Sequence, residues 1–147
     1  MIDKSSVLIT GLGIVSPLGS TIDTFWDNLV NGKCGIRLIT AFDTRGLPTT
    51  FAGHVEGFDP LAFMDKKTAQ RSARFTQLSI AVVKQCMADA GIEVVDSNRE
   101  RIGIYVGSSI CSLEDTEREG FSANFQWDKI PIMTSIRQCN HAPAYTL

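Results

Sequence analysis

Residues 7–20, where an apolar run meets a cluster of small turn residues, constrain the fold of this chain most. The run Val7–Ile9 is continuous and has turn residues on both sides, a pattern that predicts a short buried strand over 6–10. Gly11 and Gly13 follow, and they favour a sharp chain reversal because glycine tolerates positive φ. An apolar strand that leads through a glycine turn into a helix is typical of an α/β fold.

Two glycines after a strand also suggest a dinucleotide-binding turn. The residues that follow argue against this interpretation. That fingerprint needs a third glycine where this chain has Ser16, because the third glycine lets the helix pack closely on the strand. Pro17 and Gly19 postpone the helix to about Thr21, too late for its N-terminus to face a phosphate at this turn. The only nearby acidic candidate for a ribose contact, Asp43, lies in an irregular region. The sequence therefore favours a plain chain reversal here.

Helical periodicity marks two helices. The first has apolar residues at helical spacing between a cap at Ser20 or Thr21 and a stop at Gly32. A longer apolar stripe covers 75–90, with intervals of three, four and seven residues, and stops at Gly91. This second pattern predicts a long helix that faces the core.

Weaker signals fill in the remaining elements. Asp59–Pro60 is a good helix start, and 51–55 has the composition of a short strand. The apolar segment Arg101–Gly107 predicts a second strand, and Ser112 with Asp115 predicts the cap of a further helix. The order strand, helix, helix, strand, helix predicts an α/β layer with a parallel sheet.

Composition excludes several classes of function. Fourteen Lys and Arg residues against sixteen Asp and Glu residues give a formal net charge of −2, which predicts neither a nucleic-acid nor a membrane partner. No basic leader opens the chain, and no apolar stretch approaches the ~18 residues of a membrane span. We expect one domain over the 147 residues, in the cytoplasm.

The cysteines and histidines predict neither a catalytic centre nor a metal site. Cys139 has His141 two positions away, but Pro143 opposes the helix that a nucleophile elbow requires. Cys86 lies on the apolar face of the long predicted helix, where cysteine acts as a small core residue. The two histidines, His54 and His141, are too few and too separated to form a metal site with the cysteines, and we expect no cofactor.

Short segments along the whole chain carry a family resemblance. After Ile9–Gly19 they follow in order and with compatible spacing: Ile39–Asp43, Ala52–Gly53, Phe58–Pro60, Met64–Lys67, Arg74–Gln77, Ala88–Gly91 and Arg101–Ser108. Together they resemble the β-ketoacyl-[acyl carrier protein] synthases of the elongating, synthase II-like type, over residues 6 to about 120. The resemblance implies an α/β fold, the N-terminal half of a thiolase-type architecture with a mostly parallel sheet. Complete members have αβαβα layers and are usually homodimers.

The resemblance also implies a chemistry and a missing part. Members condense a cysteine-bound acyl group with a malonyl thioester in fatty acid or polyketide elongation. Their nucleophile follows a segment like Ala144–Leu147, at which this sequence stops. We therefore expect residues 1–147 to be the N-terminal domain, truncated before the nucleophile elbow and shortened within about 130–142. No catalytic residue is assigned, and the chain alone is expected to be inactive in condensation.

A cluster of cations is the strongest candidate for a binding site. Lys67, Arg71 and Arg74 fall at i, i+4 and i+7, with Lys66 beside them, so a continuous helix would align them on one face. Such a stripe is either a solvated helix face or a docking site for an anionic partner. The resemblance favours docking of acidic acyl carrier protein. It also matches Ile110 to a position that lines the acyl pocket, although ordinary packing explains Ile110 equally well.

Two functions are favoured at this stage, and an unrelated nucleotide-binding α/β domain is a weaker third possibility. The chain is either part of a condensing enzyme that uses acyl and malonyl thioesters, or a non-catalytic or degenerate fragment that still binds the carrier protein. Half of a layered architecture also leaves apolar surface uncovered, so we expect a homodimer or self-association.

Overall fold

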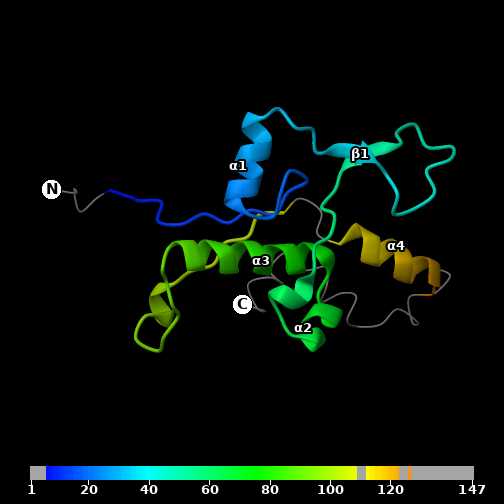
Figure 1. Cartoon of the computed structure of the whole chain (residues 1–147). Helices are drawn as coiled ribbons and strands as arrows, with labels where there is room; N and C mark the ends of the chain where they lie inside the picture. The colour runs from blue at the N-terminus through cyan, green and yellow to red at the C-terminus, as the bar shows by residue number, and fades with distance from the viewer. Residues whose placement is uncertain (1–5, 109–111, 123–125, 127–147) are drawn as a thin grey trace. The chain divides into compact units, whose positions relative to one another are not determined.

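The computed structural model describes residues 6–108, 112–122 and 126 of the chain (Figure 1). It divides into two compact units, unit 1 with residues 1–58 and 85–92 and unit 2 with residues 59–84 and 93–147. The elements are α1 (Ile22–Val30), β1 (Ile36–Leu38), β2 (Phe51–Gly53), the 3-10 turn η1 (Pro60–Ala62), α2 (Lys66–Arg71), α3 (Arg74–Asp89), the 3-10 turn η2 (Arg99–Arg101) and α4 (Leu113–Ser122).

Helix α1 of unit 1 begins and ends where the sequence predicts. Thr21 is its N-cap, and the Oγ1 atom accepts a hydrogen bond of 3.2 Å from the N–H of Thr24. Gly32 follows the helix with φ 66°, the left-handed conformation that glycine adopts without steric cost. No residue of α1 is buried, so its apolar stripe does not contact a core within the described residues.

The glycine segment of unit 1 packs directly on the C-terminal part of α3. A Cβ atom added at Gly11 would lie 2.4 Å from the carbonyl oxygen of Cys86 and 2.7 Å from the backbone nitrogen of Ala90. Positive φ among the described glycines occurs elsewhere, including Gly32 and Gly91, so the predicted left-handed turn at Gly11 and Gly13 is wrong. Glycine is required at position 11 because the backbone approaches the helix too closely for a side chain.

Side chains of α3 also bind the N–H groups of this segment. A carboxylate oxygen of Asp89 accepts from the N–H of Leu12 at 2.8 Å, and Oε1 of Gln85 accepts from the N–H of Ile14 at 3.0 Å. The Gln85 amide then donates to the carbonyl of Ser20 at 2.9 Å. Because the protein itself occupies these donors, the segment offers them to no phosphate, which agrees with the sequence argument against a dinucleotide site.

The described residues contain one sheet, an antiparallel pair of β1 and β2 in which Ile36 faces Gly53 and Leu38 faces Phe51. Strand β2 confirms part of the strand expected over 51–55, and β1 was not predicted. Glu56 contacts both Arg37 and His54, with a His54 Nε2 to Glu56 Oε1 distance of 3.1 Å. These charged contacts link β1 to the residues that follow β2, in addition to the backbone hydrogen bonds between the strands.

The two strands predicted over 6–10 and 101–107 are not formed. Val7 is 96% exposed and Tyr105 is 97% exposed, so neither segment is covered as a central strand would be. A strand forms only where a second strand accepts and donates its backbone hydrogen bonds, and the described residues give these two segments no ladder partner. The predicted parallel sheet is therefore absent from the described part of this chain.

Unit 2 is built on α3, which confirms the long helix predicted over 75–90. Gly91 ends it with φ 64°. Among the described residues, the most buried ones include a group in this unit: Ala69, Ala73, Thr76, Ile80 and Ala81. Most of these are small, and they lie on α2, on α3 and at Ala73 between the two helices. Within the described residues, no helix is long and apolar enough to cross a membrane.

Candidate functional site

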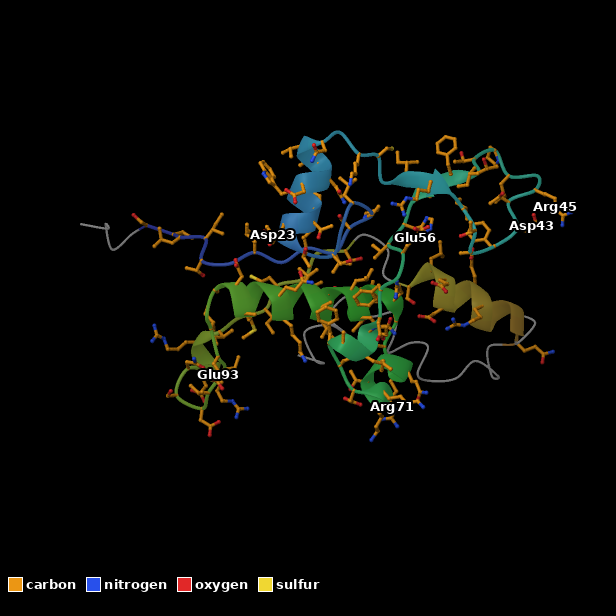
Figure 2. The ribbon with its side chains drawn as sticks, viewed as in Figure 1. Asp23, Asp43, Arg45, Glu56, Arg71 and Glu93 are labelled. Atoms are coloured by element: carbon orange, nitrogen blue, oxygen red, sulfur yellow. The ribbon has the colours of Figure 1, made fainter. Side chains whose placement is uncertain are left out.

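Helix α2 carries three of the predicted docking cations on a short, well capped turn. Lys66, Lys67 and Arg71 are all exposed, and Figure 2 shows Arg71 extended away from the ribbon of α2. Asp65 caps the helix, because its carboxylate accepts from the N–H of Thr68 at 3.0 Å and from the hydroxyl of Thr68 at 2.6 Å. These hydrogen bonds, the one from the hydroxyl first, lower the pKa of the Asp65 carboxyl below its ordinary value, so the cap is charged at neutral pH.

The predicted single stripe of cations is interrupted. Helix α2 ends at Arg71, and Ser72 is extended with φ −96° and ψ 137°. Arg74 then opens α3, so it does not share a helix face with Lys67 and Arg71, and the expectation of one continuous face was wrong. The spacing of i, i+4 and i+7 aligns side chains only on an unbroken helix. The surface cations of α2 and the guanidinium of Arg74 are therefore separate features.

The end of α2 is held by a side chain of α3. Nε2 of Gln77 donates to the carbonyl oxygen of Ala69 at 2.8 Å and to that of Ser72 at 3.2 Å. The last carbonyls of a helix have no partner inside the helix, so such donors are needed there. On the other side of α2, Nζ of Lys84 donates to the carbonyl of Phe63 at 2.6 Å. Two side chains of α3 thus hold the chain before and after α2.

A cavity of about 700 Å³ lies within unit 2, between the end of α2, the start of α3 and the start of α4. It is lined from α2 by Gln70 and from α3 by Arg74 and Gln77. Glu114 and Arg118 line it from α4, with an ion pair of 4.0 Å between them. A mixture of carboxylates and guanidinium groups makes this a polar cavity, whereas pockets for apolar ligands are lined mainly by hydrophobic side chains.

Helix α4 begins at Leu113, directly after Ser112, where the sequence predicts a further helix. Ser112 and Asp115 are both buried, and the hydroxyl of Ser112 donates to the carboxylate of Asp115. Arg118 donates to the other carboxylate oxygen, so the buried charge has a cationic partner. The network fixes the first turn of α4 and the wall that it contributes to the cavity.

Several predicted residues lie outside the described part of the chain. Ile110, the candidate for the acyl pocket, is one of them, and Cys139 and His141 are others. Cys86 is half-buried, with its Sγ atom 3.3 Å from the carbonyl oxygen of Gly11, which fits the packing role expected for it. Cys34 is exposed. No group of three metal-binding side chains occurs among the described residues.

Sequence reasoning missed the polar side chains that position these segments. Gln77, Gln85 and Asp89 lie on α3 within a helix that periodicity predicts as core-facing, and each binds backbone groups of another segment. The available signal was the polar character of Gln77 and Gln85, two half-buried positions along an apolar helix, whereas the exposed Asp89 gave no such signal. A buried polar side chain needs a partner, and backbone groups outside helices and sheets are the usual ones.

Comparisons with known proteins agree with the family resemblance found in the sequence. Residues 4–143 match the family model for the beta-ketoacyl synthase N-terminal domain. A 3-oxoacyl-[acyl-carrier-protein] synthase 2 from Vibrio cholerae is 43% identical over 111 residues, which are 76% of this chain and 27% of the relative. The protein of the same name from Coxiella burnetii is 38% identical over 116 residues, 79% of this chain and 28% of the relative. The chain thus spans less than a third of the length of these curated relatives.

The fold is shared with solved ketosynthases. The crystal structure of a beta-ketoacyl synthase from Burkholderia phymatum superposes with a TM-score of 0.77 at 25% identity, covering 95% of this chain and 35% of that one. The predicted class is therefore confirmed as the N-terminal part of a thiolase-type α/β fold. With 140 of its 147 residues in the family match (4 to 143), the chain belongs to the beta-ketoacyl synthase family, in its N-terminal domain.

Proposed function

We propose that this chain serves as the N-terminal part of a 3-oxoacyl-[acyl-carrier-protein] synthase in fatty acid elongation. The family match over residues 4–143 carries this proposal, together with the names of the curated relatives. The substrates under this proposal are an acyl thioester and a malonyl thioester, both carried by acyl carrier protein, in the cytoplasm.

The reaction forms one carbon–carbon bond and releases carbon dioxide. The malonyl group loses its carboxylate as CO₂, and the electron pair left on the α-carbon attacks the carbonyl carbon of a cysteine-bound acyl group. The cysteine thiolate then leaves, which gives a 3-oxoacyl product on the carrier protein. We assign neither Cys34 nor Cys86 to this nucleophile, and we propose that residues 1–147 alone do not catalyse the step. Cys86 is half-buried against the glycine segment, and Cys34 lies in the exposed approach to β1.

The role proposed for this chain is to receive the carrier protein on α2. Lys66, Lys67 and Arg71 place three cations on one exposed helix, and an acidic partner gains orientation and association rate from such a surface. Arg74 belongs to the adjoining cavity instead, so we propose only a secondary role for it in docking.

A charge reversal tests the docking proposal. The double variant Lys67→Glu with Arg71→Glu should raise the dissociation constant for acyl carrier protein by at least about tenfold at low salt, because each reversed charge turns attraction into repulsion. Titration at several salt concentrations should also show a weaker salt dependence. Lys33→Glu with Arg101→Glu changes the net charge equally at exposed sites outside α2 and serves as the control. Equal affinity of the α2 variant and the wild type would contradict the docking proposal.

We also keep a second candidate function, which the sequence leaves open. The chain would then bind carrier protein without chemistry, as a non-catalytic or degenerate copy. An assay for CO₂ release from malonyl-carrier protein, with acyl-carrier protein present, measures the activity of the 147-residue chain. Formation of a 3-oxo product by this chain alone would contradict its proposed inactivity.

A further inference from the structure

The docking helix α2 cannot hold its conformation by itself. It has six residues, and isolated helices shorter than about 12 residues are marginal in water. Asp65 caps its start, and the only burial along the helix is at Ala69. What fixes its end therefore decides how its cations are presented.

The side chain of Gln77 is the donor at that end. Its amide nitrogen lies 2.8 Å from the carbonyl oxygen of Ala69 and 3.2 Å from that of Ser72, so one NH₂ group spans the last turn of α2. Both partners are carbonyl oxygens, which accept only, so the NH₂ group and not the amide oxygen must face them. Arg71 lies between these two acceptors in the chain.

Helix α3 gives Gln77 a rigid base. The neighbouring position Thr76 is 1% exposed, and Ile80, one turn further on, is 2% exposed. The N–H of Gln77 donates to the carbonyl of Ala73 at 3.0 Å, inside the first turn of α3. The short helix α2 is thus tied to a helix that buries Thr76, Ile80 and Ala81.

We propose that Gln77 is a positioning residue for carrier-protein docking: by binding the end of α2, it sets the direction in which Lys67 and Arg71 face the partner. This inference rests on the proposed docking function. Gln77 adds no charge, so its contribution is to geometry. Losing it should weaken docking without altering the number of charges that take part.

The chain contains a matched control for this idea. Gln85, also on α3, binds two backbone groups of unit 1, at Ile14 and Ser20. Within the described part of the chain, its side chain makes no hydrogen bond to α2. Gln77→Met and Gln85→Met both replace an amide with an apolar side chain of similar length, and each leaves two backbone groups without their partner. The two variants should lose similar stability.

The binding experiment compares the wild-type chain and both variants with acyl carrier protein at several salt concentrations. Gln77→Met should raise the dissociation constant about fivefold to tenfold, the size expected from one or two net hydrogen bonds, with the salt dependence of the wild type retained. Gln85→Met should bind like the wild type. Unchanged binding by Gln77→Met, or an equal loss in Gln85→Met, would overturn the proposal.

Amide hydrogen exchange separates this inference from the docking proposal. In Gln77→Met, the amides of residues 66–72 should exchange several times faster than in the wild type, with no carrier protein present. Faster exchange together with a wild-type chain that does not bind carrier protein would remove the docking function and, with it, the role of Gln77 in docking. Exchange at the wild-type rate would show that Gln77 does not hold α2.

Discussion

Helices α1 and α3 have similar sequence patterns and very different environments. Both have apolar residues at helical spacing, and the sequence predicts both ends of α1 and the C-terminal end of α3. Helix α3 buries Thr76 and Ile80, which are 1% and 2% exposed, whereas Trp26 on α1 is 60% exposed and no α1 residue is buried. Apolar periodicity therefore predicts which face of a helix is suited to burial, but it does not predict which segment covers that face.

The largest test of this contrast is a truncation on each helix. Ile80→Ala should destabilise the chain by about 2–5 kcal/mol, because a buried isoleucine loses its contacts and leaves a cavity. Trp26→Ala should change the free energy of unfolding by less than about 0.5 kcal/mol, the usual range for an exposed position. Urea unfolding followed by circular dichroism measures both. At a protein concentration low enough to keep the chain monomeric, similar losses for the two variants would mean that another part of the chain covers α1.

The second test concerns the part of unit 1 that is packed. Gly11→Ala should cost about 1–3 kcal/mol, because its Cβ atom would lie 2.4 Å from the backbone oxygen of Cys86 and the helix must shift. Gly107→Ala is the control, since a Cβ atom at Gly107 meets nothing within 4 Å and its φ is not in the left-handed region. Thermal unfolding of both variants gives the comparison. A Gly11→Ala protein as stable as the control would show that the glycine segment does not pack on α3.

The sequence predicted the helices of this chain well and the strands poorly. Thr21, Asp59 and Gly91 fix helix ends through local hydrogen bonds and backbone conformation, which the neighbouring residues determine. A strand such as 6–10 needs a second strand for its backbone hydrogen bonds, and that strand can lie far away in the sequence. The apolar run of 6–10 therefore predicts burial but does not identify the strand that pairs with it.

The candidate site was predicted in part, for the same reason. Lys66, Lys67 and Arg71 lie together on α2 because they are close in sequence, but the break at Ser72 was not visible in the spacing. Ser72 departs from helical geometry, and the side chain of Gln77 binds its carbonyl oxygen. Ser72 and Gln77 lie on opposite sides of the helix break, so helical spacing does not predict their contact. Contacts of this kind are determined by the packing of α2 on α3 and not by local propensity.

The third test uses the exposed stripe of α1. Trp26 and Val30 are 60% and 59% exposed on neighbouring turns, and apolar surface of this kind favours association in water. We predict that the chain self-associates and that Trp26→Glu with Val30→Glu raises the dissociation constant by about tenfold. Sedimentation at several concentrations measures it. Asp27→Lys, a charge change on the polar side of the same helix, should leave association unchanged.

The smallest expected effect is a difference in acid sensitivity between α2 and α1, which have different N-cap residues. Helix α2 has a titrating cap, Asp65, while α1 has the neutral hydroxyl of Thr21. The pKa of Asp65 is lowered in the folded chain from its ordinary value of 3.8, so an unfolded chain takes up this proton first as the pH falls. The contribution of the cap is therefore complete above pH 3.8 and is lost as the pH falls through the lower, folded pKa.

Amide exchange in α2 and α1, followed as the pH is lowered from about 5 to 2, tests this difference within one molecule. After correction for the intrinsic pH dependence of exchange, protection of α2 should fall while protection of α1 changes less. In Asp65→Asn the side chain still accepts the bond from Thr68 but does not titrate, so the acid-induced loss in α2 should disappear. If α2 lost protection in the same pH range in Asp65→Asn, the loss would have to come from global acid unfolding. The proposed difference between a charged and a neutral cap would then be rejected.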